Sequence, residues 1–244
     1  MQRQNNAQEI LEKIEKMYKF TVPLVSPVST TLATAADAGD ASLDLTSETG
    51  LADGDHLFVY GDEVELVQVL DLDAAPESTL TRALAFDHPA GRAVSKVARE
   101  DLGYIEEGGV TLSGNFSQSP IGAANSRVAI AYIAAEGGEM SASFGLREAN
   151  LKNVLAAFMV DESSLSGAGT ASDPYTAVIG RDTIGSQLNH AYRGVFRMIN
   201  GKTWEADFLN CAPEVAFSGA LGAKGQPAVW TVQFRPTSVV FRSW

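Results

Sequence analysis

Histidine and cysteine, the side chains most often used for proton transfer, nucleophilic attack and transition-metal binding, are scarce in this sequence. Three histidines, His56, His88 and His190, and one cysteine, Cys211, are scattered along 244 residues. None of them has the spacing of a paired metal or redox motif. We therefore expect the histidines to be surface or capping residues and Cys211 to be a small buried side chain. The sequence predicts no catalytic residue, no metal ligand and no cofactor.

The acidic and glycine-rich stretches also lack the spacings of known binding loops. Asp53 with Asp55, or Asp71 with Asp73, could offer oxygen ligands to calcium, but neither pair has an EF-hand spacing that ends in glutamate. The 22 glycines form no phosphate-binding loop and no GxSxG nucleophile turn. A pair of glycosidase carboxylates would meet only in the fold, so a carboxylate hydrolase stays open as one alternative.

The charge of the chain is concentrated in one segment. Residues 35–110 hold 17 acidic and four basic residues, a net charge of −13, whereas residues 111–244 hold ten of each sign. Clustered lysine and arginine, which grip a phosphate backbone, are missing from both segments. We expect a solvated acidic surface on one segment and no specific binding to nucleic acid.

The composition is that of a globular protein, with 45% hydrophobic residues. No stretch approaches the roughly 18 apolar residues that span a bilayer, so we expect no membrane association. The charged N-terminus does not resemble a signal peptide. A single cysteine excludes an intrachain disulfide and fits assembly in a reducing cytoplasm.

The first 34 residues are predicted to form a helix followed by an extended connector. Apolar residues recur with helical spacing after a capping asparagine, at Ile10, Leu11, Ile14, Met17 and Tyr18. The connector over 21–30 contains two prolines and several β-branched residues.

Residues 35–102 are predicted to form a small acidic β module. Short runs of strand-forming residues lie close together and are separated by turn residues, at 41–47, 57–60, 63–70, 78–84 and 92–97. Asp53-Gly54 and Gly61-Asp62 mark two of the turns. Such spacing is typical of a compact meander or a small barrel.

Residues 103–244 are predicted to form a larger β domain with one flanking helix. Longer alternating runs lie at 109–118, 127–135 and 139–145, the last two joined by a turn at Gly137-Gly138. An apolar stripe predicts an amphipathic helix over 146–160. Asn200-Gly201 predicts a two-residue type I′ turn between strands 190–200 and 202–210. Two further strands flank a glycine-rich turn at 219–225, and a last strand closes the chain.

Aromatic residues lie mainly in these predicted strands and are expected to be core or subunit-interface residues. They are Tyr132, Phe144, Tyr192, Phe196, Trp204, Phe208, Trp230 and Phe234. A carbohydrate-binding module is a further alternative, and it would require Trp204 and Trp230 to lie together on an exposed groove.

Two stretches of the sequence resemble proteins of tailed bacteriophages. The segment DGDHLFVYGDEVELVQVL with STLTRALAFDHPAGRAV is similar to a short β module of virion proteins. Residues 103–244, with long strands, one helix and the ending EVAFSGALGAKGQPAVWTVQFRP, resemble a major tail tube protein. The acidic module would be an addition to the minimal tube protein.

The resemblance implies a mainly β fold, a β-sandwich or barrel tube domain that carries one flanking helix. It implies a non-enzymatic virion subunit that forms homohexameric rings, stacked into a tube and joined to other tail proteins. DNA would pass through the lumen without specific binding, and the acidic module would lie outside the wall. A neck, tail terminator or baseplate protein is the nearest alternative, since similar modules occur there.

Overall fold

Almost all regular structure in the described part of the chain is β. The computed structural model describes residues 11–23, 26–72, 78–103, 105–115, 118–121, 131–134, 139–146, 155, 166–168, 170–176, 190–198, 201–213 and 230–244. Within them, one 13-stranded antiparallel sheet runs through the molecule, and β9 (Gln118–Ile121) pairs separately with β10 (Ala131–Ala134). The predicted mainly β class is confirmed.

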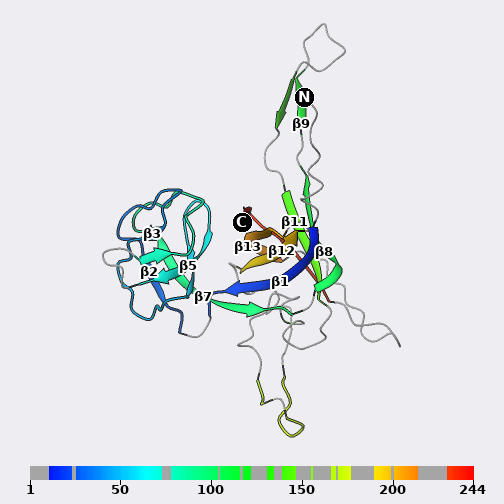
Figure 1. Ribbon diagram of the computed structural model, residues 1–244, viewed down its shortest axis with the longest axis horizontal. Helices are drawn as coiled ribbons and strands as arrows, with labels where there is room; N and C mark the ends of the chain where they lie inside the picture. The colour runs from blue at the N-terminus through cyan, green and yellow to red at the C-terminus, as the bar shows by residue number, and fades with distance from the viewer. Residues whose placement is uncertain are drawn as a thin grey trace.

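The acidic segment forms a compact unit whose pairing closes on itself (Figure 1). Its strands are β2 (Ser29–Thr31), β3 (Ser42–Leu43), β4 (His56–Val59), β5 (Glu65–Asp71), β6 (Ser78–Leu80) and β7 (Ala93–Asp101). They pair in the order β2-β7-β4-β5-β6-β3, and a bridge between Leu32 and Leu45 returns to β2. These strands form one unit of short antiparallel pairs, and we call this unit the module.

The core of the module consists of aliphatic side chains. Its buried members are Leu32, Ala36, Leu43, Leu57, Val59, Val67, Val69, Leu80, Leu84 and Val94. Gly54 has a φ of 84°, which fits the turn expected at Asp53-Gly54 because glycine adopts this conformation without steric cost. Local turns and short strands thus place one small core inside one stretch of chain.

The predicted N-terminal helix is wrong, because β1 (Leu11–Thr21) is a strand. β1 lies between β12 (His190–Met198) and the second half of β7, and it pairs antiparallel with both. Met17 faces one core while Phe20 enters another, so apolar residues occupy both faces of the strand. A strand buried on both faces loses strict alternation, and its pattern imitated a helical one.

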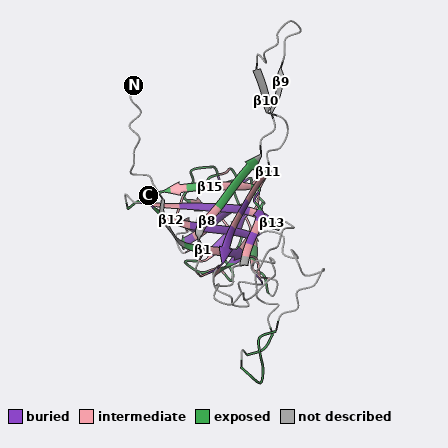
Figure 2. Ribbon diagram, turned by 90° about the vertical axis from the view of Figure 1, so that its right-hand side faces the viewer, coloured by how far each residue is buried: buried purple, intermediate pink, exposed green. Residues whose placement is uncertain are grey.

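The rest of the chain forms the body, in which the sheet folds over into two layers. One layer contains β1, β12, β13 (Thr203–Pro213) and β15 (Ser238–Ser243). The other contains β8 (Ile105–Asn115), β11 (Glu139–Leu146) and β14 (Trp230–Arg235). β13 joins the layers, since its last residues pair with β14. Figure 2 shows β8 and β11 crossing steeply over β12 and β13.

Aromatic rings fill the space between the two layers. Tyr192 of β12 stacks on Phe234 of β14 with ring centroids 4.5 Å apart. Phe144 of β11 meets Tyr192 edge-on at 5.6 Å, and Phe208 of β13 meets Phe234 at 5.6 Å. These contacts cross from one layer to the other, which confirms the prediction that these four aromatics are core residues.

An arm extends from the body along β8 and β11 toward β9 and β10 (Figure 1). β8 pairs with β11, and β9 pairs with β10, so these strands form the two sides of one long hairpin. The predicted hairpin of 127–135 with 139–145 around Gly137-Gly138 is therefore wrong. An alternating pattern predicts a strand but does not identify its partner. Here β10 pairs with β9, and β11 pairs with β8.

The predicted hairpin between β12 and β13 is present, but the described residues close it at Met198 and Lys202. Met198 accepts a hydrogen bond from the Gly201 amide at 2.8 Å, and its own amide donates to the Lys202 carbonyl at 2.9 Å. Gly201 has a φ of 80°, as expected of a glycine in this turn, whereas Asn200 lies outside the described residues.

Two further predictions fall largely outside the described residues. The predicted helix over 146–160 is described only at Leu146, which ends β11, and at Leu155, which is helical and buried. The glycine-rich turn at 219–225 and the strand before it lie outside as well, whereas the strand after it is β14.

Candidate functional site

A cluster of buried and partly buried charges lies where the module meets the body. We call it the charged junction, and it comprises Glu65, Arg82, Arg193, Glu205, Asp207 and Arg242. The first two come from the module, on β5 and just after β6; the others come from β12, β13 and β15. Successive residues on β12 and β13 point alternately toward the aromatic core and toward the opposite face of the sheet. The charged residues of both strands lie on that opposite face.

Asp207 is the centre of the junction. Arg193 donates two hydrogen bonds to its carboxylate, from Nε at 2.6 Å and from Nη2 at 2.9 Å. Arg242 donates to the same carboxylate at 2.5 Å and reaches Glu65 of the module at 3.3 Å. One body carboxylate therefore orients two guanidinium groups, and one of them bridges to the module.

Glu65 is fully buried and is held by the module itself. Its carboxylate accepts hydrogen bonds from the backbone amides of Ala85 and Phe86 at 2.7 and 3.2 Å. His88 lies 3.3 Å away through Nε2. Because the module fixes this carboxylate from several directions, Arg242 meets a preorganised partner rather than a mobile side chain.

Arg82 of the module forms an ion pair with Glu205 of the body. Burial, followed by the charges of Arg193 and Arg242, lowers the pKa of Arg82. Its guanidinium also lies 4.6 Å from the centroid of the Trp244 ring. The junction thus has contacts in both directions between the module and the body.

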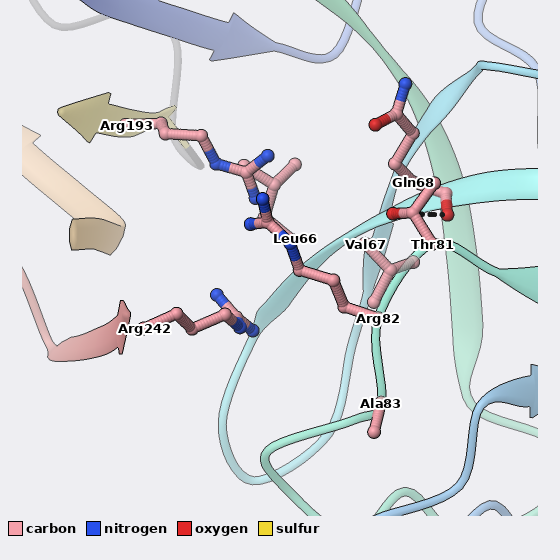
Figure 3. A pocket seen from close by; sticks show the side chains of 8 residues that line it. All are labelled: Leu66, Val67, Gln68, Thr81, Arg82, Ala83, Arg193 and Arg242. Carbon is pink, nitrogen blue, oxygen red and sulfur yellow. Dashed lines mark hydrogen bonds between the residues drawn. The ribbon is translucent and has the colours of Figure 1, made fainter. Parts of the chain in front are cut away.

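Three arginines converge on a small cavity at this junction (Figure 3). The cavity is lined by Leu66, Val67, Gln68, Thr81, Arg82, Ala83, Arg193 and Arg242, and its volume is about 10 Å³. That volume is near the lower limit for a single water molecule. Each arginine is already paired with a carboxylate, so three positive charges meet three negative ones. The arrangement is suited to fixing the module on the body rather than to binding an anionic ligand.

A second group of polar side chains is buried in the body near the aromatic core. His190 and Cys211 are directly opposite each other on β12 and β13. Burial, followed by the charge of Lys19, lowers the pKa of His190 to about 3. Burial raises the pKa of the Cys211 thiol and of Tyr192 well above their usual values. Imidazole and thiol are both neutral at pH 7, so they do not form the activated pair of a cysteine nucleophile.

The residues singled out from the sequence are placed mainly for structural roles. All three histidines are buried, which corrects the expectation of surface or capping positions, and Cys211 is buried as expected. Asp53 accepts a hydrogen bond from the Leu72 amide, and Asp55 pairs with Lys96 at 2.6 Å. Sequence reasoning missed the charged junction, because Glu205 and Asp207 have the alternation of a solvent-facing strand.

The two aspartate pairs considered for calcium are only partly described by the structure. Asp71 lies in β5, whereas Asp73 is outside the described residues. No group of three or more histidine, cysteine, aspartate or glutamate residues is placed to hold a metal ion among those described.

Trp204 and Trp230 come from strands that pair over a short stretch only. β13 and β14 pair at Ala212 and Pro213, and the strands are antiparallel. Trp204 is near the start of β13 and Trp230 begins β14, so their backbone positions lie on opposite sides of the paired segment. This placement disfavours a carbohydrate platform built from both residues.

Within the described residues, two edge strands of the body pair on one side only. β8 pairs with β11, β15 pairs with β13, and no other described strand pairs with either. Thr111, Leu112, Ser113 and Gly114 of β8 are all exposed, as are Phe241 and Ser243 of β15. Unpaired strand edges present rows of amide and carbonyl groups that can pair with another chain.

No protein-family model and no curated protein matches this sequence. Among the described residues, no helix is both long enough and apolar enough to cross a membrane.

Proposed function

We propose that the chain is a structural subunit of a phage tail, a tail tube protein that assembles into stacked hexameric rings. The proposal includes no enzymatic activity and no cofactor. The edges of the body carry it: among the described strands, β8 and β15 end the two layers with one partner each, and an arm extends from the β8–β11 hairpin. Ring closure pairs such edges, because each subunit offers an edge to its neighbour.

In this proposal residues 103–244 form a tube-like β-sandwich with a helix over 146–160 on its flank. Residues 35–102 form an acidic module outside the wall, where the tail meets other tail proteins. The distribution of charge supports this arrangement, because residues 111–244 carry ten charges of each sign. A lumen without clustered lysine or arginine does not retain DNA through its phosphates, so DNA can pass. The subunit would assemble in the host cytoplasm and function in the virion.

Negative-stain electron microscopy of the purified full chain tests this function. We expect stacked rings or tubes with a central channel. Single closed rings that never stack would favour a tail terminator or neck protein instead. Isolated particles without rings would contradict a tube subunit, provided that circular dichroism shows the chain to be folded.

A further inference from the structure

Three of the five exposed large hydrophobic side chains that the structure describes lie on the two edge strands or directly after one of them. Leu112 on β8 is 43% exposed, Phe241 on β15 is 56% exposed, and Trp244 directly after β15 is 58% exposed. The other two, Leu70 and Tyr175, lie elsewhere. Apolar side chains on an open edge add a contact surface to its free hydrogen-bonding groups.

The two edges also match in length and in composition. β8 pairs regularly with β11 from Val110 to Asn115, and β15 spans Ser238–Ser243, so each edge offers six residues. Neither stretch contains lysine or proline, the residues that commonly protect a sheet edge from pairing. Arg242 is the one charged residue in them, and it is already bound to Asp207 and Glu65 within its own chain.

We propose that β8 of one copy pairs with β15 of the next copy, so that identical chains join head to tail through these two edges. The inference rests on the proposed function, because a ring requires two different surfaces that meet in each contact. β8 ends one layer of the body and β15 ends the other, so the pairing would continue the sheet from subunit to subunit. Leu112, Phe241 and Trp244 would be buried at the contact.

A mixing experiment tests which strands meet. Leu112→Cys and Phe241→Cys variants of the full chain are prepared separately, mixed in equal amounts, allowed to assemble and treated with a short bis-maleimide. The native Cys211 is buried and its thiol pKa is raised, so it should not react in the folded chain. Ser113→Cys mixed with Ser243→Cys samples the neighbouring positions on both strands.

We expect cross-linked dimers from the mixtures and none from any variant alone, with peptide mass spectrometry joining β8 to β15. Assemblies in which two β8 strands or two β15 strands are linked would overturn the proposed pairing, as would assemblies with no link at all. In both cases the tube function would stand. A parent chain that never assembles would overturn the pairing and the tube function together.

Charge substitutions provide an independent test with a matched control. Leu112→Lys and Phe241→Lys each place a charge on one edge and should raise the concentration needed for assembly by on the order of 10-fold. Leu70→Lys changes an equally exposed hydrophobic residue, at 59%, in the module and should leave assembly unchanged. Leu112→Lys combined with Phe241→Glu should restore part of the loss. Equal effects of all three lysine variants would contradict an edge-specific contact.

Discussion

The module and the body achieve β structure in different ways. The module encloses an aliphatic core within one continuous stretch, from β2 to β7, and its strands pair mostly with near neighbours in the chain. The body encloses an aromatic core between two layers, and its strands come from both ends of the chain, with Leu11 of β1 opposite Met198 of β12. Local pairing favours early and independent folding, whereas the body must close long loops first.

The connection between the two regions reflects this difference. The module is inserted into a hairpin, because Thr21 at the end of β1 is directly paired with Ala98 in β7. Two kinds of contact then hold it against the body. One is an apolar cluster that includes Phe20, Phe58 and Leu209, and the other is the charged junction. The module could therefore be removed without breaking the path of the body strands, although buried contacts hold it in place.

Removal of the module is expected to have the largest effect. Residues 22–97 are replaced by Asn-Gly, which can join Thr21 to Ala98 by a two-residue hairpin turn. Phe20→Thr and Leu209→Thr are included because both side chains lose their apolar cover. We expect a folded body whose aromatic core gives a near-ultraviolet circular dichroism signal like that of the parent.

The separate module, residues 26–98, provides the matched half of this experiment. It should unfold cooperatively on its own, since its core contains no residue of the body. A body that loses its near-ultraviolet signal when the module is removed would show that the two regions form one cooperative unit.

Asp207→Ala tests the charged junction. The substitution leaves Arg193 and Arg242 without their shared carboxylate in a buried site. Removing one partner of a buried ion pair costs about 3–5 kcal/mol, and we expect a loss of this size in the free energy of unfolding. Urea unfolding followed by tryptophan fluorescence measures it.

The matched control is Arg92→Ala, which removes an exposed pair with Asp62 in the module. Exposed pairs contribute about 0–1 kcal/mol, so this variant should unfold almost like the parent. Similar losses in both variants would mean that the junction is no better organised than the surface.

Two glycines with the same left-handed backbone conformation allow a direct comparison of the two regions. Gly54 in the module and Gly201 in the body have φ values of 84° and 80°, and a Cβ at either position meets no atom within 4 Å. Valine should therefore cost about 1–3 kcal/mol at each position through backbone strain alone. Gly201→Val should also weaken assembly, because it disturbs the register of β12 and β13, whereas Gly54→Val should not.

Asparagine tolerates positive φ better than valine, so Gly201→Asn should retain most of the stability and assembly. Thermal unfolding and electron microscopy report the two properties separately. If Gly54→Val impaired assembly as strongly as Gly201→Val, the module would belong to the assembling surface.

The smallest expected effect is a dependence of stability on pH. Burial, followed by the charges of Arg193 and Arg99, lowers the pKa of His56 to about 4, and burial lowers that of His190 to about 3. Both are neutral in the folded chain, so below pH 6.5 the unfolded chain takes up protons that the folded chain does not. The free energy of unfolding should fall from pH 7 to pH 5, by at most about 1.4 kcal/mol per pH unit for each histidine.

Urea unfolding at pH 7, 6 and 5 measures this slope. His56→Asn and His190→Asn should each reduce it, the first at the module boundary and the second in the body core. An unchanged slope in either variant would show that the histidine in question does not remain neutral on folding.

The module was more predictable from sequence than the body, and the difference has a physical basis. Its strands are bounded by local turn residues such as Asp53-Gly54, which act over a few positions. The β1 strand was mistaken for a helix because its partners lie far away in sequence and both its faces are covered. The closure of the β12–β13 hairpin beside Gly201 depends on the pairing of Met198 with Lys202, which composition alone does not determine.

The charged junction could not be predicted for a related reason. Glu205 and Asp207 alternate with core residues along β13. Solvent-facing residues show the same alternation on a strand with one exposed face. The module covers these two side chains, and its residues lie more than a hundred positions earlier in the sequence. Alternation identifies two faces of a strand, but it does not say which element covers each face.

The central claim is self-assembly, and sedimentation velocity of the full chain across micromolar concentrations tests it most directly. We expect a species of six times the mass of the 25.9 kDa chain together with larger stacks. Leu112→Lys, analysed in parallel, should shift the distribution toward single chains without loss of folding. A folded monomer of the parent at every concentration would contradict the claim.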